Sequence, residues 1–196
     1  ADIQTTAPTA FSIKTQSYPL SRKLYFYKRS ISTNKHIEAF IKYAVGEQGQ
    51  EQIVRSNFVS PNLFIADVAD LPANAPQDYR RLLRKANRIP INVYFNPGSH
   101  QFDRQALDKL GKINRLLRQK AYVNRQVMLM GFSDNTGSET IQNELSKLRA
   151  KKVQAYLREY GNSRASVHWY GSAMPLASNL SYAGRRQNCR VEVWIR

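Results

Sequence analysis

The chain of 196 residues is 42% hydrophobic and 11% aromatic, which is typical of a core-forming globular protein and excludes disorder throughout. Its formal net charge is +16, and residues 71–196 hold 22 Lys and Arg against 8 Asp and Glu. Such a surface favours polyanions such as nucleic acid, anionic lipid or acidic cell-wall polymer, although a solvated basic face that only aids solubility explains it equally well.

The sequence also excludes several kinds of site. No run approaches the roughly 18 apolar residues of a membrane-spanning helix, and no signal-peptide pattern stands at the N-terminus. Cys189 is the one cysteine, which rules out an internal disulfide. The histidines, His36, His100 and His168, have no zinc-ligand spacing, so we expect neither a metal site nor a cofactor.

Residues 1–70 predict few elements of secondary structure. The aromatic run LYFYKR at 24–29 favours a strand. Residues 34–55 place apolar side chains at spacings of three and four, which is typical of a helix, and the two glycines within 46–49 divide it. Because so few elements make a poor core, we expect this segment to be part of something larger.

A linker is predicted at 71–79, where prolines and small polar residues cluster, followed by a basic helix up to residue 88. The remaining residues alternate between strand and helix patterns. The expected elements are a strand at 89–95, a helix at 102–120 with Asp103 as N-cap, a strand at 126–132, a helix from 139 with Ser138 as N-cap, and strands at 166–171 and 190–196. This order predicts an α+β fold, a β-α-β-α-β-β two-layer sandwich whose two helices cover one face of a mixed sheet.

Arg149 breaks the pattern of the second helix. It lies about 40° around the helix axis from Leu145 and Val153, within the apolar arc. A guanidinium there requires an anion, because it cannot lose its proton. The preceding turn offers Asp134 and the free backbone N–H groups of a helix N-terminus, so the turn and Arg149 together suit a zwitterion such as an amino-acid head group. The alternative is that Asp134 and Arg149 form a buried salt bridge and bind nothing.

These residues resemble the pattern of OmpA-like peptidoglycan-binding domains, and the resemblance covers residues 89–196. The matched positions are Asp134, Gly137, Asn143, Leu145, Ser146, Arg149, Ala150, Val153 and Leu157, with Ser133 in place of the usual Thr. The closing segment GRRQNCRVEVWI matches at Gly184, Arg185, Asn188, Arg190, Val191 and Glu192, with Cys189 in place of an Arg. The segment VYFNPGSHQFD is similar to the first strand and loop of that family.

The resemblance implies the fold expected above and a binding site for diaminopimelate, an amino acid of the peptidoglycan stem peptide. Asp134 would hold its ammonium and Arg149 its carboxylate, while Asn143 would support the loop or the ligand. Phe95 and Asn96 would line the pocket.

Arg190 is either a further member of this site or a structural residue that, with Asn188, ties the last loop to the sheet. The function implied is non-catalytic anchoring to peptidoglycan in the periplasm of a Gram-negative bacterium. No carboxylate pair or metal site points to an enzyme.

Residues 1–70 resemble the closing part of phosphate-type periplasmic substrate-binding proteins. The matched positions are Tyr18, Pro19, Leu20, Ser21, Arg22, Leu24, Tyr25, Tyr27, Gly49, Gln50, Phe58 and Val59. The Ser-Gly-Thr loop of that family is absent, so we expect no phosphate site. The resemblances imply a partial substrate-binding-protein-like α/β segment at 1–70, a linker and basic helix at 71–88, and an OmpA-like domain at 89–196.

Other functions stay open at this stage. The basic C-terminal part and the aromatics Tyr94, Tyr122, Trp169 and Tyr170 are compatible with nucleic-acid binding, although most of these aromatics lie on predicted strands and core packing explains them. A solute-binding component of a transport system and a flagellar or envelope scaffold are the alternatives within the cell envelope. The partners we expect are peptidoglycan and other envelope proteins rather than nucleic acid, and the sequence does not give the oligomeric state.

Overall fold

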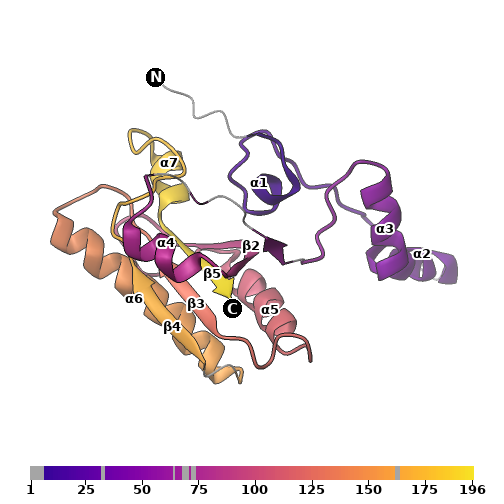
Figure 1. Ribbon diagram of the computed structural model, residues 1–196. Helices are drawn as coiled ribbons and strands as arrows, with labels where there is room; N and C mark the ends of the chain where they lie inside the picture. Colours follow the sequence, from indigo (N-terminus) through magenta and orange to yellow (C-terminus); the bar gives the residue numbers. More distant parts are fainter. Residues whose placement is uncertain (1–6, 32–33, 64, 68–70, 72–73, 162–163) are drawn as a thin grey trace. The chain divides into compact units, whose positions relative to one another are not determined.

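The computed structural model describes residues 7–31, 34–63, 65–67, 71, 74–161 and 164–196 (Figure 1). The backbone divides into two compact units, Thr6–Asn62 and Leu63–Arg196. Within the described ranges, every helix is too short or too polar to span a membrane.

The N-terminal unit is built from helices. They are α1 (Ala10–Lys14), α2 (Lys35–Val45) and α3 (Glu47–Arg55). The Asn34 side chain accepts a hydrogen bond from the His36 backbone N–H at 2.9 Å and so caps α2. A Cβ atom on Gly49 would stand 2.3 Å from the Tyr43 carbonyl oxygen, so only glycine allows α2 and α3 to approach this closely. The predicted division of this helical region at 46–49 is confirmed.

The strand predicted at 24–29 is wrong. The segment has no regular secondary structure, and its side chains face solvent, with Tyr25 64% and Tyr27 90% exposed. A strand forms only where a neighbouring strand accepts and donates its backbone hydrogen bonds, and the described residues of this unit include no other strand. The α/β segment expected at 1–70 is therefore helical over the described part of the N-terminal unit.

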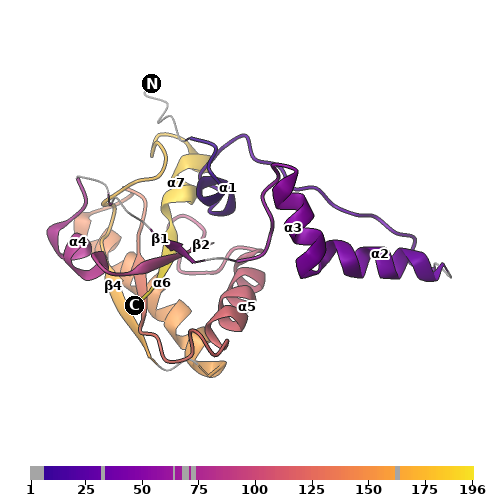
Figure 2. The same cartoon turned by 45° about the vertical axis from the view of Figure 1, so that its right-hand side comes forward.

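The C-terminal unit contains one five-stranded sheet and four helices among its described residues (Figures 1 and 2). The elements are β1 (Ala66–Asp67), α4 (Gln77–Leu83), β2 (Asn87–Tyr94), α5 (Ala106–Leu117), β3 (Val127–Gly131), α6 (Glu139–Glu159), β4 (Ala165–Trp169), α7 (Tyr182–Asn188) and β5 (Arg190–Ile195). The strand order is β1-β2-β5-β3-β4; β3 and β4 are parallel, and the other pairs are antiparallel. The predicted β-α-β-α-β-β order and mixed sheet are confirmed, with β1 and α7 as additions.

Both faces of the sheet are covered, which differs from the two-layer arrangement expected. Val193 and Leu129 pack with α5 and α6 in one buried cluster, whereas Trp194 of the same strand β5 packs with Tyr79 and Leu83 of α4 in a second cluster. Tyr79 and Leu83 share one side of α4 because they are four residues apart. The segment expected as a linker and basic helix at 71–88 thus supplies a third layer, and β2 already begins at Asn87.

The two predicted helix caps have different outcomes. Ser138 caps α6, accepting a hydrogen bond from the Ile141 N–H at 3.4 Å, as expected. Asp103 does not cap α5, because Gln105 is the residue that precedes the helix. The Asp103 carboxylate instead accepts from the Gln105 N–H at 3.0 Å and pairs with Arg186 of α7 at 3.2 Å.

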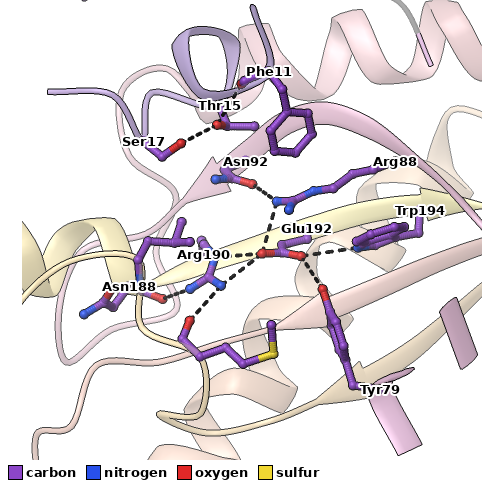
Figure 3. A network of polar contacts seen from close by, with 12 residues as sticks. Phe11, Thr15, Ser17, Tyr79, Arg88, Asn92, Asn188, Arg190, Glu192 and Trp194 are labelled. Atoms are coloured by element: carbon purple, nitrogen blue, oxygen red, sulfur yellow. Dashed lines mark hydrogen bonds and ion pairs between the residues drawn. The ribbon is translucent and has the colours of Figure 1, made fainter. Parts of the chain in front are cut away.

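A buried polar network ties α4 to the sheet (Figure 3). Glu192 of β5 is 1% exposed and accepts hydrogen bonds from the Tyr79 hydroxyl at 2.9 Å and the Trp194 indole N–H at 3.3 Å. Its carboxylate pairs with Arg88 at 3.1 Å and with Arg190 at 3.0 Å. Burial alone raises the pKa of Glu192, but the two guanidinium groups outweigh burial and hold the pKa below its usual value.

Replacing Leu83 tests whether α4 is part of the folded core. We expect Leu83→Ala to lower the free energy of unfolding by about 2–5 kcal/mol, because a buried side chain leaves a cavity. Arg81→Ala, on the exposed side of the same helix, is the matched control and should change it by less than about 0.5 kcal/mol. Urea unfolding curves measure both, and a linker role for this segment predicts equal curves.

The second prediction concerns Glu192. We expect Glu192→Gln to cost about 3–5 kcal/mol at neutral pH, because it leaves Arg88 and Arg190 buried without a carboxylate. Since the pKa of Glu192 is lower in the folded than in the unfolded protein, its stabilisation is present above about pH 4.3, the unfolded value, and is lost as pH falls through the folded pKa. The difference in unfolding free energy between the two proteins should therefore become smaller as the pH falls from 7 into the acid range. A constant difference would contradict the ion-pair assignment.

Candidate functional site

The loop that leaves β3 is held on both sides by backbone hydrogen bonds. The Phe132 N–H donates to the Arg190 carbonyl at 2.8 Å, and the Ser133 N–H donates to the Gly171 carbonyl at 2.7 Å. Gly137 then turns the chain with φ of +81°, in the left-handed region that favours glycine, and α6 begins two residues later. Asp134 thereby lies in the loop that leads into the N-terminus of α6, the end of a helix at which free N–H groups and the helix dipole favour negative charge.

The Asp134 carboxylate is buried, and one of its two oxygens has a hydrogen-bond partner. The residue is 1% exposed, and its Oδ2 accepts a hydrogen bond from the Thr136 hydroxyl at 3.1 Å. Its Oδ1 is buried with no hydrogen-bond partner. A buried carboxylate oxygen without a partner is costly, so Asp134 offers an open acceptor to a cationic donor.

Arg149 is fully buried, and its guanidinium is held by backbone carbonyl groups. Nε donates to the Ser99 carbonyl at 2.9 Å, Nη1 to the Phe132 carbonyl at 3.1 Å and Nη2 to the Asn96 carbonyl at 3.3 Å. These carbonyls come from the end of β3 and from the loop at 96–101. They satisfy three donors, but as neutral groups they leave the positive charge uncancelled.

Asp134 and Arg149 form no ion pair, although both belong to the described residues, so the salt-bridge alternative is wrong. Burial lowers the pKa of Arg149 below its usual range, and the nearby Cys189 thiol and Asp134 carboxylate act in the opposite direction without outweighing it. The site therefore holds two neighbouring opposite charges, neither of which neutralises the other by direct contact.

Phe95 and Asn96, predicted to line the pocket, both lie against Arg149. The Phe95 side chain is buried, and its ring centroid is 5.8 Å from the Arg149 guanidinium carbon. Asn96 supplies a carbonyl to Arg149 and is itself exposed. The loop that starts at Asn96 thus connects the buried guanidinium to the surface.

Gln142, the neighbour of Asn143, supports the loop, which was one of the two roles predicted for Asn143. The Gln142 amide donates to the Gly137 carbonyl at 2.9 Å and so supports the loop. Asn143 is half-buried, and its Oδ1 would lie 2.8 Å from a Cβ atom placed on Gly171. Sequence reasoning missed Gln142, whose position in the first turn of α6 lets its side chain reach back to the turn.

Arg190 lies apart from Asp134 and Arg149. It belongs to the network on the α4 face of the sheet (Figure 3). Arg149 extends instead from α6, whose buried residues pack on the opposite face. Arg190 Nη2 donates to the Met174 carbonyl at 3.0 Å, and the guanidinium carbon of Arg190 is 4.0 Å from the Phe132 ring centroid. These contacts correspond to the structural role that the sequence left open for Arg190.

Asn188 ties the same loop to α7. Its Oδ1 accepts hydrogen bonds from the Leu176 N–H at 2.7 Å and the Ala177 N–H at 3.0 Å. Elsewhere in the described ranges, no group of three or more His, Cys, Asp or Glu side chains is placed to hold a metal ion.

Comparison with known proteins bears on this geometry. Residues 94–189 match the model of the OmpA family. The chain is 36% identical over 101 residues to the peptidoglycan-binding protein ArfA of Mycobacterium tuberculosis, a match that covers 50% of this chain and 28% of that protein. It is 32% identical over 109 residues to the probable lipoprotein YiaD of Escherichia coli, covering 55% of this chain and 49% of that protein.

Among solved structures, the C-terminal domain of MotB from Helicobacter pylori is similar, with 27% identity and a TM-score of 0.47 over 53% of this chain and 81% of that one. The chain spans less than half the length of ArfA and YiaD. The family match runs from the last residue of β2 to the residue before β5 and so lies within the sheet-containing unit. Residues 94–189 are therefore similar to OmpA domains.

Proposed function

We propose that the C-terminal domain binds peptidoglycan without catalysis, by receiving the zwitterionic end of diaminopimelate, and so anchors the protein to the cell wall. The observation that carries the proposal is the unpartnered Oδ1 of buried Asp134 beside the uncancelled charge of buried Arg149. OmpA family peptidoglycan-binding proteins are non-catalytic, and the similarity to ArfA supports peptidoglycan as the ligand.

Each end of the zwitterion has a defined place in this proposal. The ammonium donates to Asp134 Oδ1, which supplies the missing partner of that oxygen. The carboxylate accepts from Arg149 in place of one of its carbonyl partners, because a charged acceptor makes a hydrogen bond about twice as strong as a neutral one. Asn96 and Ser99 supply two of those carbonyls, so replacing either one requires their loop to move away from the guanidinium.

The proposed location follows from the ligand. A domain that holds diaminopimelate acts in the cell envelope, and we propose the periplasm as the compartment. The resemblance of residues 1–70 to phosphate-type substrate-binding proteins stays a prediction, and no phosphate site is assigned to this unit.

The first experiment is co-sedimentation of the protein with insoluble peptidoglycan that contains diaminopimelate. We expect Asp134→Ala and Arg149→Ala each to weaken binding by about tenfold to a hundredfold, because each removes a charge-assisted hydrogen bond. Asp108→Ala and Arg158→Ala are the matched controls, since both charges lie on exposed surfaces of α5 and α6 and should leave binding unchanged. Thermal melts check that the variants fold.

Asp134→Asn separates this proposal from general attraction to polyanions. The variant removes a negative charge, so non-specific binding of the basic domain would stay the same or increase and would decline steeply with salt. The proposed site predicts the opposite result, a loss of binding. Unchanged sedimentation of Asp134→Asn would reject the site.

The second experiment tests the role of Arg149. Peptidoglycan with lysine in place of diaminopimelate keeps the side-chain ammonium but lacks the carboxylate assigned to Arg149. We expect the wild-type protein to prefer the diaminopimelate form by about tenfold, the size of one charge-assisted hydrogen bond. Arg149→Met should lower this preference to about one, whereas Asp134→Ala should weaken binding of both forms. Equal binding of both forms by the wild type would contradict a carboxylate at Arg149.

A further inference from the structure

An exposed tryptophan lies beside the proposed site. Trp169 is the last residue of β4, is 44% exposed, and pairs in parallel register with Gly131, three residues before Asp134. Neighbouring strands lie about 4.8 Å apart, and three extended residues span at most about 11 Å. Trp169 and Asp134 therefore belong to the same end of the sheet.

Hydrogen bonds connect the segment after Trp169 to the loop that holds Asp134. Gly171, two residues after Trp169, donates its N–H to the Ser146 hydroxyl at 3.1 Å and accepts from the Ser133 N–H at 2.7 Å, so this segment is fixed to both α6 and the Asp134 loop. The side chain of Asn143 lies against Gly171. Trp169 is thus held in a set position relative to the loop.

A charged side chain of α6 lies over the indole ring. The Lys147 ammonium is 5.1 Å from the Trp169 ring centroid, and the Glu144 carboxylate is 4.0 Å from that ammonium. Lys147 lies one helical turn after Asn143 on the same side of α6. An exposed aromatic ring with an ammonium over it, and a carboxylate beside that ammonium, suits a sugar, whose C–H face stacks on the ring while its hydroxyl and acetamido groups form hydrogen bonds.

We infer that Trp169 and Lys147 form a subsite for the glycan strand of peptidoglycan. The inference rests on the proposed function, because every stem peptide is attached to an N-acetylated sugar two residues before diaminopimelate. Three residues of extended chain span about 10 Å, so a ligand seated at Asp134 and Arg149 carries its sugar to this distance from the site. Among the described residues, Trp169 is the exposed aromatic residue at the end of β4, the strand that pairs in parallel with β3.

The experiment compares two soluble ligands by calorimetry, the diaminopimelate-containing tetrapeptide and the same tetrapeptide linked to its disaccharide. We expect the wild type to bind the sugar-bearing ligand about tenfold more tightly. Trp169→Ala should lower this ratio to about one while the affinity for the free tetrapeptide stays unchanged, and Lys147→Ala should lower the ratio in part. Tyr160→Ala, which removes an exposed aromatic ring at the opposite end of α6, is the matched control.

Tryptophan fluorescence gives an independent measurement. The chain has two tryptophans, and Trp194 is 1% exposed, so a blue shift on adding ligand reports on Trp169. The sugar-bearing ligand should produce this shift and the free tetrapeptide should not.

Each other outcome overturns the subsite in a recognisable way. A ratio of one in the wild type, or an unchanged ratio in Trp169→Ala, rejects it while leaving the stem-peptide site intact. If Trp169→Ala loses affinity for both ligands and also loses thermal stability, the indole ring has a packing role rather than a binding role. If the wild type binds both ligands equally and forms a complex with an envelope protein that depends on Trp169, the indole ring contacts a protein partner instead of a sugar. Failure of the wild type to bind either ligand rejects the proposed function itself.

Discussion

The buried guanidinium of Arg149 is the group on which the geometry of the site depends. It joins α6 to the end of β3 and to the loop at 96–101 through the carbonyls of Phe132, Asn96 and Ser99. An apolar side chain of similar length at this position makes none of these three bonds, and the loop then loses two of its attachments to the helix. Carbonyl groups fix the guanidinium without consuming its charge, because neutral acceptors satisfy N–H donors but provide no counter-ion. The same side chain can therefore be structural in the closed domain and still attract an anion.

Two buried carboxylates of this domain, Glu192 and Asp134, show how differently the same kind of group is used. On the α4 face, Glu192 neutralises one of its two guanidinium partners and accepts bonds from Tyr79 and Trp194, so its carboxylate has no capacity left for a ligand. On the α6 face, Asp134 keeps one oxygen unpartnered although a cation is nearby. A buried carboxylate oxygen without a partner lowers the stability of the fold. Proteins keep destabilising groups of this kind at sites where a ligand supplies the missing partner. The contrast supports Asp134 and Arg149, rather than Arg190, as the pair that receives the proposed zwitterion.

The sequence predicted the parts of this fold that depend on local patterns. The strands around Val93, Leu129 and Val193 and the cap at Ser138 follow from alternation and turn chemistry, and Arg149 was identified because it interrupts an apolar arc. The features that the sequence did not predict depend on residues far away in the chain. The run at 24–29 has strand propensity but no neighbouring strand, and Asp103 turns to Arg186, a residue 83 positions away in the chain. The position of Arg190 on the opposite face, and the support that Gln142 gives to the loop, depend on side-chain directions that spacing does not specify.

Charge acts on this domain at two ranges. The excess of Lys and Arg in residues 71–196 attracts any polyanion, and salt screens that attraction beyond about 10 Å at 0.1 M ionic strength. Asp134 opposes this attraction, since a carboxylate repels anions, and a site designed only for polyanions would gain by losing it. A buried carboxylate beside Arg149 suits a ligand that carries a cation next to an anion. In the proposed function, the general basic surface attracts an acidic polymer, whereas the unpartnered carboxylate oxygen of Asp134 selects an amino-acid terminus within it.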